Sequence, residues 1–151
     1  MAADEPEDGF GEVARGFAAG ETLETYEAMY RLVLTAYGYR CALTGEQFER
    51  SNGLWHGDLD VVAIVPRDLG GPLRINNFLP LVFPAAEAFE AGQWLIADDY
   101  AVLADRDVLD RRLVERLHPS GFLQLPKEAV FHPDKTLLAR HRERILAARP
   151  D

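Results

Sequence analysis

Residues 59–103 read LDVVAIVPRDLGGPLRINNFLPLVFPAAEAFEAGQWLIADDYAVL, and this stretch decides the fold. Its first part, residues 59–65, is a continuous apolar run interrupted only by Asp60, which predicts a buried strand. The segment RDLGGP follows at residues 67–72, and its Asp, Gly and Pro content is typical of a tight loop. A short buried strand that leads into a tight loop is therefore the first unit we expect.

The second part of the stretch predicts a helix and a hairpin. Residues 84–90 are expected to form a short helix that ends at Gly92. Two strands follow at residues 93–97 and 100–104, joined by an Asp-Asp pair. We interpret these two acids as turn residues rather than as a metal-binding pair, because Asp is common at hairpin tips.

Helices are expected on both sides of this stretch. Apolar residues recur at three- and four-residue steps from about residue 23 and predict a helix that ends at Gly38. The last helix is expected to begin at Pro133, a favourable first helical position, and to run to about residue 148. Shorter elements complete the prediction: strands at residues 39–43 and 122–125, and a helix that ends at Pro119.

Length and composition indicate one globular domain. The chain has 151 residues, of which 48% are hydrophobic and 10% aromatic, so we expect a flexible acidic arm at residues 1–20 and a single domain at residues 21–151. No apolar run approaches the roughly 18 to 20 residues that cross a bilayer. The opening MAADEPEDGFGE lacks the basic-then-apolar pattern of a signal segment, and the single Cys41 has no partner for an internal disulfide. These features predict a cytoplasmic protein.

The net charge of −9 is unevenly distributed. Residues 21–105 hold thirteen Asp and Glu against five Arg, which gives −8, whereas residues 106–149 hold ten Lys and Arg against six acids, which gives +4. Nonspecific nucleic-acid binding draws its affinity from Lys and Arg, so this charge disfavours DNA as the partner. The best candidates for phosphate contacts are three arginines of the last helix: Arg140, Arg142 and Arg144. Their presence is explained equally well by a helix face that is exposed to solvent.

Several motifs match one known family in order and spacing. They are YGYRCALTG at residues 37–45, FEAG at 89–92, WLIADDYAVL at 94–103 and GFLQLPKEAVFHPDKTLLARHRERIL at 121–146. With the strand and loop quoted above, the chain resembles the restriction-type HNH endonucleases of bacteria over roughly residues 26–146. The resemblance implies an α+β fold, in which a degenerate HNH (ββα-metal) core is flanked by N-terminal and C-terminal helices and short antiparallel strands.

The same resemblance implies that the reactive residues of the family are missing. In the family a strand of the form LxAAHIxP carries the His that acts as general base, and a His-His pair on the helix serves the divalent cation. Carried onto this sequence, the base position is Ala63, the His pair is Ala85 and Ala86, and the loop Asn of the family is Asn77. A methyl group neither accepts a proton nor binds a cation. We therefore expect no cofactor, with Mg or Mn relevant only to a site elsewhere.

Our interpretation is a pseudonuclease, an HNH endonuclease-like protein without metal-dependent cleavage that is retained for binding or regulation. A protein partner or self-association is favoured over nucleic acid, and no membrane is involved. One alternative is an active metal-dependent DNA endonuclease with a relocated site at His56, Asp58 and Asp60, because imidazole and carboxylates suit a catalytic cation. Asp58 and Asp60 would point to the same side of a regular strand. The simpler interpretation of His56 is a loop residue.

A second alternative belongs to another class of protein. An acidic DNA mimic or immunity-type protein would occupy the basic cleft of a partner, and its binding would weaken with salt. The other histidines favour structural roles. His118 and His132 each precede a Pro and are interpreted as turn or cap residues, and His141 is expected on the half-buried face of the last helix.

Overall fold

The computed structural model describes residues 23–51, 53 and 55–149, so the predicted arm at residues 1–20 lies outside the described part. The helices and strands are α2 (Leu23–Ala36), β1 (Leu59–Ala63), β2 (Phe78–Val82), α3 (Phe83–Glu90), β3 (Trp94–Ile96), β4 (Val102–Ala104), α4 (Arg111–Arg116) and α5 (Lys135–Ala148). Three single 3-10 turns separate some of them: η2 (Arg67–Leu69), η3 (Ile75–Asn77) and η4 (Ala129–Phe131). Two small antiparallel sheets and their surrounding helices make the described part an α+β fold, as the sequence predicts.

The first sheet is the hairpin of β1 and β2, with Leu59 opposite Val82 and Ala63 opposite Phe78. The sequence analysis placed no strand at β2, whose third residue is Pro80. Ile64 N–H donates to the Asn77 carbonyl (2.7 Å). In this register the backbone N–H and C=O groups of alternate β2 residues point towards β1, and the backbone nitrogen and carbonyl of Pro80 point away from it. Because Pro80 has no N–H, and that position would not donate to β1, the β1–β2 ladder loses no hydrogen bond. The Pro80 carbonyl accepts from Ala42 N–H (2.8 Å) on the side away from β1.

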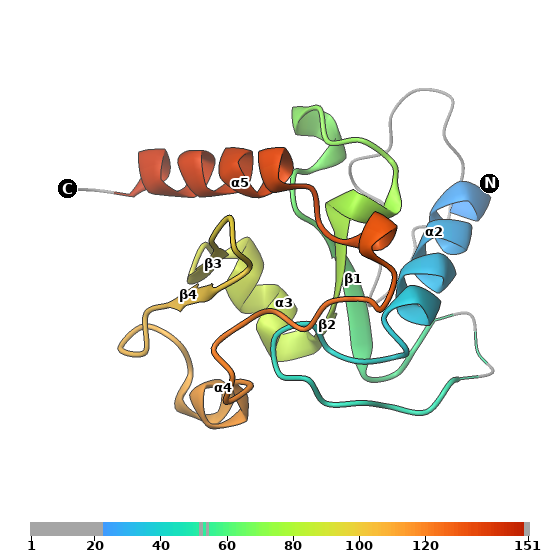
Figure 1. Ribbon diagram of the computed structural model, residues 1–151, viewed down its shortest axis with the longest axis horizontal. Helices are drawn as coiled ribbons and strands as arrows, with labels where there is room; N and C mark the ends of the chain where they lie inside the picture. The colour runs from blue at the N-terminus through green and yellow to red at the C-terminus, as the bar shows by residue number, and fades with distance from the viewer. Residues whose placement is uncertain (1–22, 52, 54, 150–151) are drawn as a thin grey trace, which may run out of the picture.

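Helices α2 and α3 both contact this hairpin, and Figure 1 shows β1 and β2 between them. One face of α2 is buried, as its apolar spacing predicts, with Tyr26, Tyr30 and Val33 each at most 1% exposed. Tyr30 also donates its hydroxyl hydrogen to the Leu59 carbonyl at 2.9 Å, which fixes the start of β1 against the helix. Burying a side chain of this size stabilises the fold by roughly 1.5–3 kcal/mol.

The second sheet, β3 with β4, lies beside α5, which contacts β3 (Figure 1). In its turn, Ala97 N–H donates to the Ala101 carbonyl (2.9 Å) and Tyr100 N–H donates to the Ala97 carbonyl (2.9 Å). The Asp99 carboxylate accepts from the Ala101 N–H (3.0 Å). Tyr100 has a φ of 71° in this turn. The Asp-Asp pair therefore lies in a turn, as predicted.

Three predicted boundaries were wrong. The segments at 39–43 and 122–125 are not strands: each holds a single bridge, Arg40 with Gln47 and Phe122 with Ala101. The first is cut short because Tyr39 has a φ of 57° and the chain turns back at once. The last helix begins at Lys135 rather than at residue 133, because the Asp134 carboxylate caps it by accepting from Thr136 N–H (2.8 Å).

None of the helices within the described residues is long and apolar enough to cross a membrane.

Candidate functional site

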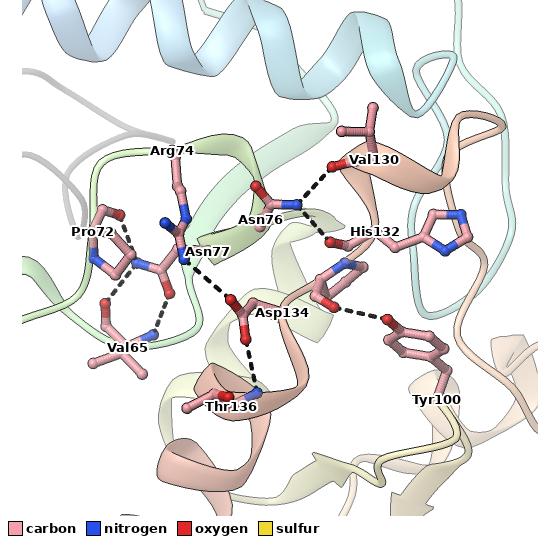
Figure 2. A network of polar contacts seen from close by, with 11 residues as sticks. Val65, Pro72, Arg74, Asn76, Asn77, Tyr100, Val130, His132, Asp134 and Thr136 are labelled. Atoms are coloured by element: carbon pink, nitrogen blue, oxygen red, sulfur yellow. Dashed lines mark hydrogen bonds and ion pairs between the residues drawn. The ribbon is translucent and has the colours of Figure 1, made fainter.

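Asn77 ties the loop after β1 to the start of β2, as Figure 2 shows. Its side chain is fully buried, and its Oδ1 accepts from Val65 N–H at 2.9 Å. Its Nδ2 donates to the Val65 carbonyl (2.9 Å) and to the Pro72 carbonyl (3.1 Å). These three bonds stop β1 from continuing to residue 65 and shape the loop. They account for Asn77 as a structural residue.

The same loop passes so close to β1 that one position admits no side chain. A Cβ built on Gly71 would lie 1.8 Å from the Val65 carbonyl oxygen and 2.8 Å from Asn77 Nδ2. Both neighbours are fixed, the first by being backbone and the second by its hydrogen bonds. The loop therefore requires Gly at this position.

The three Ala positions lie in two different environments. Ala63 is the last residue of β1; it is half-buried and lines a cavity. Ala85 and Ala86 lie in the first turns of α3 and are at most 2% exposed, packed in the core. The Ala85 carbonyl accepts a hydrogen bond from Trp94 Nε1 at 3.1 Å. Ala63, which the resemblance aligns with the base, thus opens on a cavity, whereas the two positions aligned with the His pair are packed in the core.

The cavity beside Ala63 has a volume of about 210 Å³ and brings together four parts of the chain. Its walls come from the end of β1, the loop at η2, the end of α3 and the middle of α5. The lining residues are Ala63, Pro66, Arg67, Phe89, Glu90, His141 and Arg144.

His141 is the most deeply buried polar group in this wall. Its side chain is 1% exposed and stacks on Phe89, with ring centroids 4.2 Å apart and an interplanar angle of 14°. Its Nδ1 has no hydrogen-bond partner. Burial lowers the pKa of His141 to about 4, and the positive charges of Arg144 and Arg142 act in the same direction. The imidazole is therefore uncharged at neutral pH.

The arginines named from the sequence differ in what they contact. Arg142 donates to the Ile96 carbonyl (2.8 Å) and pairs with Asp98 (2.8 Å), and Arg140 donates to the Leu69 carbonyl (3.0 Å). Arg144 is exposed, borders the cavity and makes no hydrogen bond to another described residue. Of the three, Arg142 is the one paired with a carboxylate, and Arg144 is the one that lines the cavity.

Arg67 was not named as a candidate, although it lines the cavity. Its Nε donates to the Tyr26 hydroxyl oxygen (3.2 Å), and its Nη1 donates to the Gly71 carbonyl. Both contacts hold the guanidinium at the mouth of the loop. No local motif marks it, because its position follows from the packing of the loop on α2.

His56, Asp58 and Asp60 do not form the arrangement that a relocated site requires. His56 Nε2 bonds to the Glu49 carbonyl (2.8 Å), and its Nδ1 accepts from Asp58 N–H (3.0 Å) and Leu59 N–H (3.2 Å). Asp58 is exposed, whereas Asp60 is buried and accepts from Val61 N–H at 2.8 Å. Across residues 23–51, 53 and 55–149, no three His, Cys, Asp or Glu side chains are grouped to hold a metal ion.

Comparison with known proteins gives a likeness among solved structures. No protein-family model and no curated protein sequence matches this chain. Among solved structures it is similar to a modification-dependent TagI restriction endonuclease, with a TM-score of 0.57 at 23% sequence identity. The fold is that of a restriction endonuclease. The match covers 78% of this chain and 37% of that one, so the chain spans little more than a third of the enzyme that it resembles.

The sequence analysis found the positions of this site but not its cavity. The motif alignment led to Ala63 and Asn77, and periodicity placed His141 on a half-buried face of α5, which the structure confirms. That α5 returns to lie beside Ala63 is a tertiary contact between residues almost eighty positions apart, and no local pattern carried that information.

Proposed function

We propose that this chain is a degenerate HNH-type protein that binds a ligand or partner and does not cleave nucleic acid at the family site. The observation that carries the proposal is the set of methyl groups at Ala63, Ala85 and Ala86. Hydrolysis at such a site needs a general base and ligands for a divalent cation, and alanine supplies neither.

The burial of these positions supports the proposal further. Ala85 and Ala86 are enclosed in the hydrophobic core, so apolar side chains surround the positions that the resemblance assigns to the His pair. What persists is the framework: the loop held by Asn77, the close approach at Gly71 and the cavity beside Ala63. A maintained framework without its reactive groups favours binding over catalysis.

Charge guides the choice of macromolecular partner. Residues 21–105 carry a net −8, and the charge of Arg142 on α5 is paired with Asp98. We therefore propose a protein with a basic surface, or a second copy of the chain, rather than a DNA duplex. The relocated site gains no support from the geometry, because metal binding by His56 would first break its bonds to the backbone.

A cleavage assay tests the proposal. The purified full chain is incubated with unmodified and with methylated plasmid DNA in Mg and in Mn, since the structural relative is a modification-dependent restriction endonuclease. We expect both plasmids to stay intact. Metal-dependent cleavage that disappears in His56→Ala and in Asp60→Ala would contradict the proposal and assign the activity to the relocated site. The variant Asp58→Asn tests the third residue of the relocated site, which is exposed.

A further inference from the structure

The cavity beside Ala63 contains polar groups that lie outside the loop held by Asn77. Two of them come from α5, where His141 and Arg144 stand three residues apart and so lie on one face of the helix. They face a wall that includes Ala63, where the small side chain leaves space. The volume of this cavity is about 210 Å³.

His141 is a buried residue with an unsatisfied hydrogen-bonding atom. It is 1% exposed, yet its Nδ1 has no hydrogen-bond partner. Leaving a buried polar atom unpaired costs about 1–3 kcal/mol. Because His141 lines the cavity, a group bound there lies against its imidazole ring. Stacking on Phe89 holds the ring in place for that contact.

The charges at the cavity select the class of occupant. The guanidinium groups of Arg67 and Arg144 line it, opposed by the single carboxylate of Glu90 among the lining residues, and His141 is uncharged at neutral pH. This local excess of positive charge stands out in a chain with a net charge of −9. Guanidinium groups bind phosphate oxygens through paired, charge-assisted hydrogen bonds.

We propose that this cavity binds a phosphate monoester, with Arg144 and Arg67 contacting the phosphate oxygens and His141 hydrogen-bonded to the bound group. The source is either a small phosphorylated molecule or the terminal phosphate of a nucleic acid. A monoester carries up to two negative charges and one substituent, which suits a small cavity with two guanidinium groups better than an internal diester does. The inference rests on the proposed function, since at a catalytic site a metal ion would contact the phosphate.

The first experiment is a titration of the full chain with inorganic phosphate in EDTA at low ionic strength. We expect saturable binding that Arg144→Gln weakens by about tenfold or more, the loss of one charge-assisted contact. The matched control is Arg140→Gln, on the same helix but outside the cavity, which should change the Kd less than about twofold. Absence of saturable binding, or equal weakening by the two variants, would overturn the proposal.

A second measurement places the anion without altering the core. In the wild-type chain, the imidazole carbon-bound proton signals of His141 should shift on addition of phosphate, while those of His56 and His132 stay in place. Both of the latter are bonded to backbone carbonyls away from the cavity. Shifts at all histidines alike, or at none, would count against a site beside His141.

The source of the phosphate is decided with three probes: a pentose 5-phosphate, a short single-stranded oligonucleotide with a 5′-phosphate, and the same oligonucleotide without it. Arg144-dependent binding of the sugar phosphate alone assigns a small molecule, and binding of the phosphorylated oligonucleotide assigns a strand end. Equal, Arg144-dependent binding of both oligonucleotides would overturn the monoester assignment. All these titrations are metal-free, so their failure is separate from a failure of the proposed function, which the cleavage assay reports.

Discussion

Two regions meet at the end of β1, and they differ in how completely the protein satisfies its own polar groups. In the loop held by Asn77, the amide oxygen and nitrogen form three hydrogen bonds within the chain. In the cavity beside Ala63, a few residues away, His141 Nδ1 is unpaired and Arg144 is exposed. The loop is complete as a structural device, whereas the cavity has the polar groups of a binding site. The following predictions separate the two.

The largest effect is expected at Gly71. A Cβ there would lie 1.8 Å from the Val65 carbonyl oxygen, so Gly71→Ala must displace backbone and should lower the free energy of unfolding by about 4 kcal/mol. Gly57→Ala is the control, because nothing lies within 4 Å of its added Cβ, and should change stability by less than about 1 kcal/mol. Urea unfolding measures both. Similar stabilities for the two variants would show that the loop yields easily.

Neighbouring asparagines give the next comparison. Asn77→Ala leaves a buried N–H and two carbonyls without partners and should cost about 3 kcal/mol of unfolding free energy. Half-buried Asn76 donates to the Val130 carbonyl (2.9 Å) and the His132 carbonyl (2.8 Å), so Asn76→Ala should cost about 1 kcal/mol. The same unfolding measurement ranks them. If Asn76→Ala is the more harmful change, the contact with η4 is what holds this loop (Figure 2).

Histidine can be restored at one family position more easily than at the others. Ala63→His places the ring beside a cavity and should change the unfolding free energy by less than about 1 kcal/mol. Ala85→His forces a larger polar ring into the core and should cost about 2–3 kcal/mol. Thermal and urea unfolding of the two variants provide the test. Equal tolerance would mean that the core around α3 can reopen to hold a metal ligand.

A smaller effect is expected from pH. Because the pKa of folded His141 is about 4, against 6.5 for an ordinary His, the unfolded chain binds the proton more readily between these values. The contribution of the uncharged His141 to the free energy of unfolding is therefore complete above about pH 6.5, and it is lost as the pH falls towards 4. Because the exposed Arg144 borders the cavity, solvent reduces the effect, and we expect a loss of about 2 kcal/mol.

The comparison chain for this prediction is His141→Phe, which retains an aromatic ring against Phe89. The carboxylates titrate alike in both chains, so the difference between their unfolding free energies isolates His141. Relative to His141→Phe, the wild-type chain should lose about 2 kcal/mol of unfolding free energy between pH 7 and pH 4. A constant difference across this range would contradict the burial of a neutral imidazole.

The sequence predicted the elements whose apolar spacing is clear. The face of α2, the short α3 and the β3–β4 hairpin are where periodicity and turn residues put them. Strand β2 was missed because Pro80 argues against a strand unless the register is known, and the register depends on the pairing with β1. The strand at 39–43 was predicted too long because the left-handed Tyr39 leaves no local signal.

The site divides in the same way. The motif alignment identified Ala63 and Asn77, since these positions are defined by their neighbours in the sequence. The cavity depends on α5 folding back beside β1 and on Arg67 being held by Tyr26, and both are long-range contacts. Chemistry carried by one segment could be predicted, and chemistry assembled from four segments could not.

The central proposal is that this chain lacks the metal site of the HNH endonucleases that it resembles, and calorimetric titration with Mn and with Mg tests it most directly. The full chain is stripped of metal, dialysed at neutral pH and titrated with each ion. The account predicts no saturable binding of either cation, because methyl groups occupy the three family positions. Stoichiometric binding of Mn or Mg would contradict it and show that the chain has built a cation site from other residues.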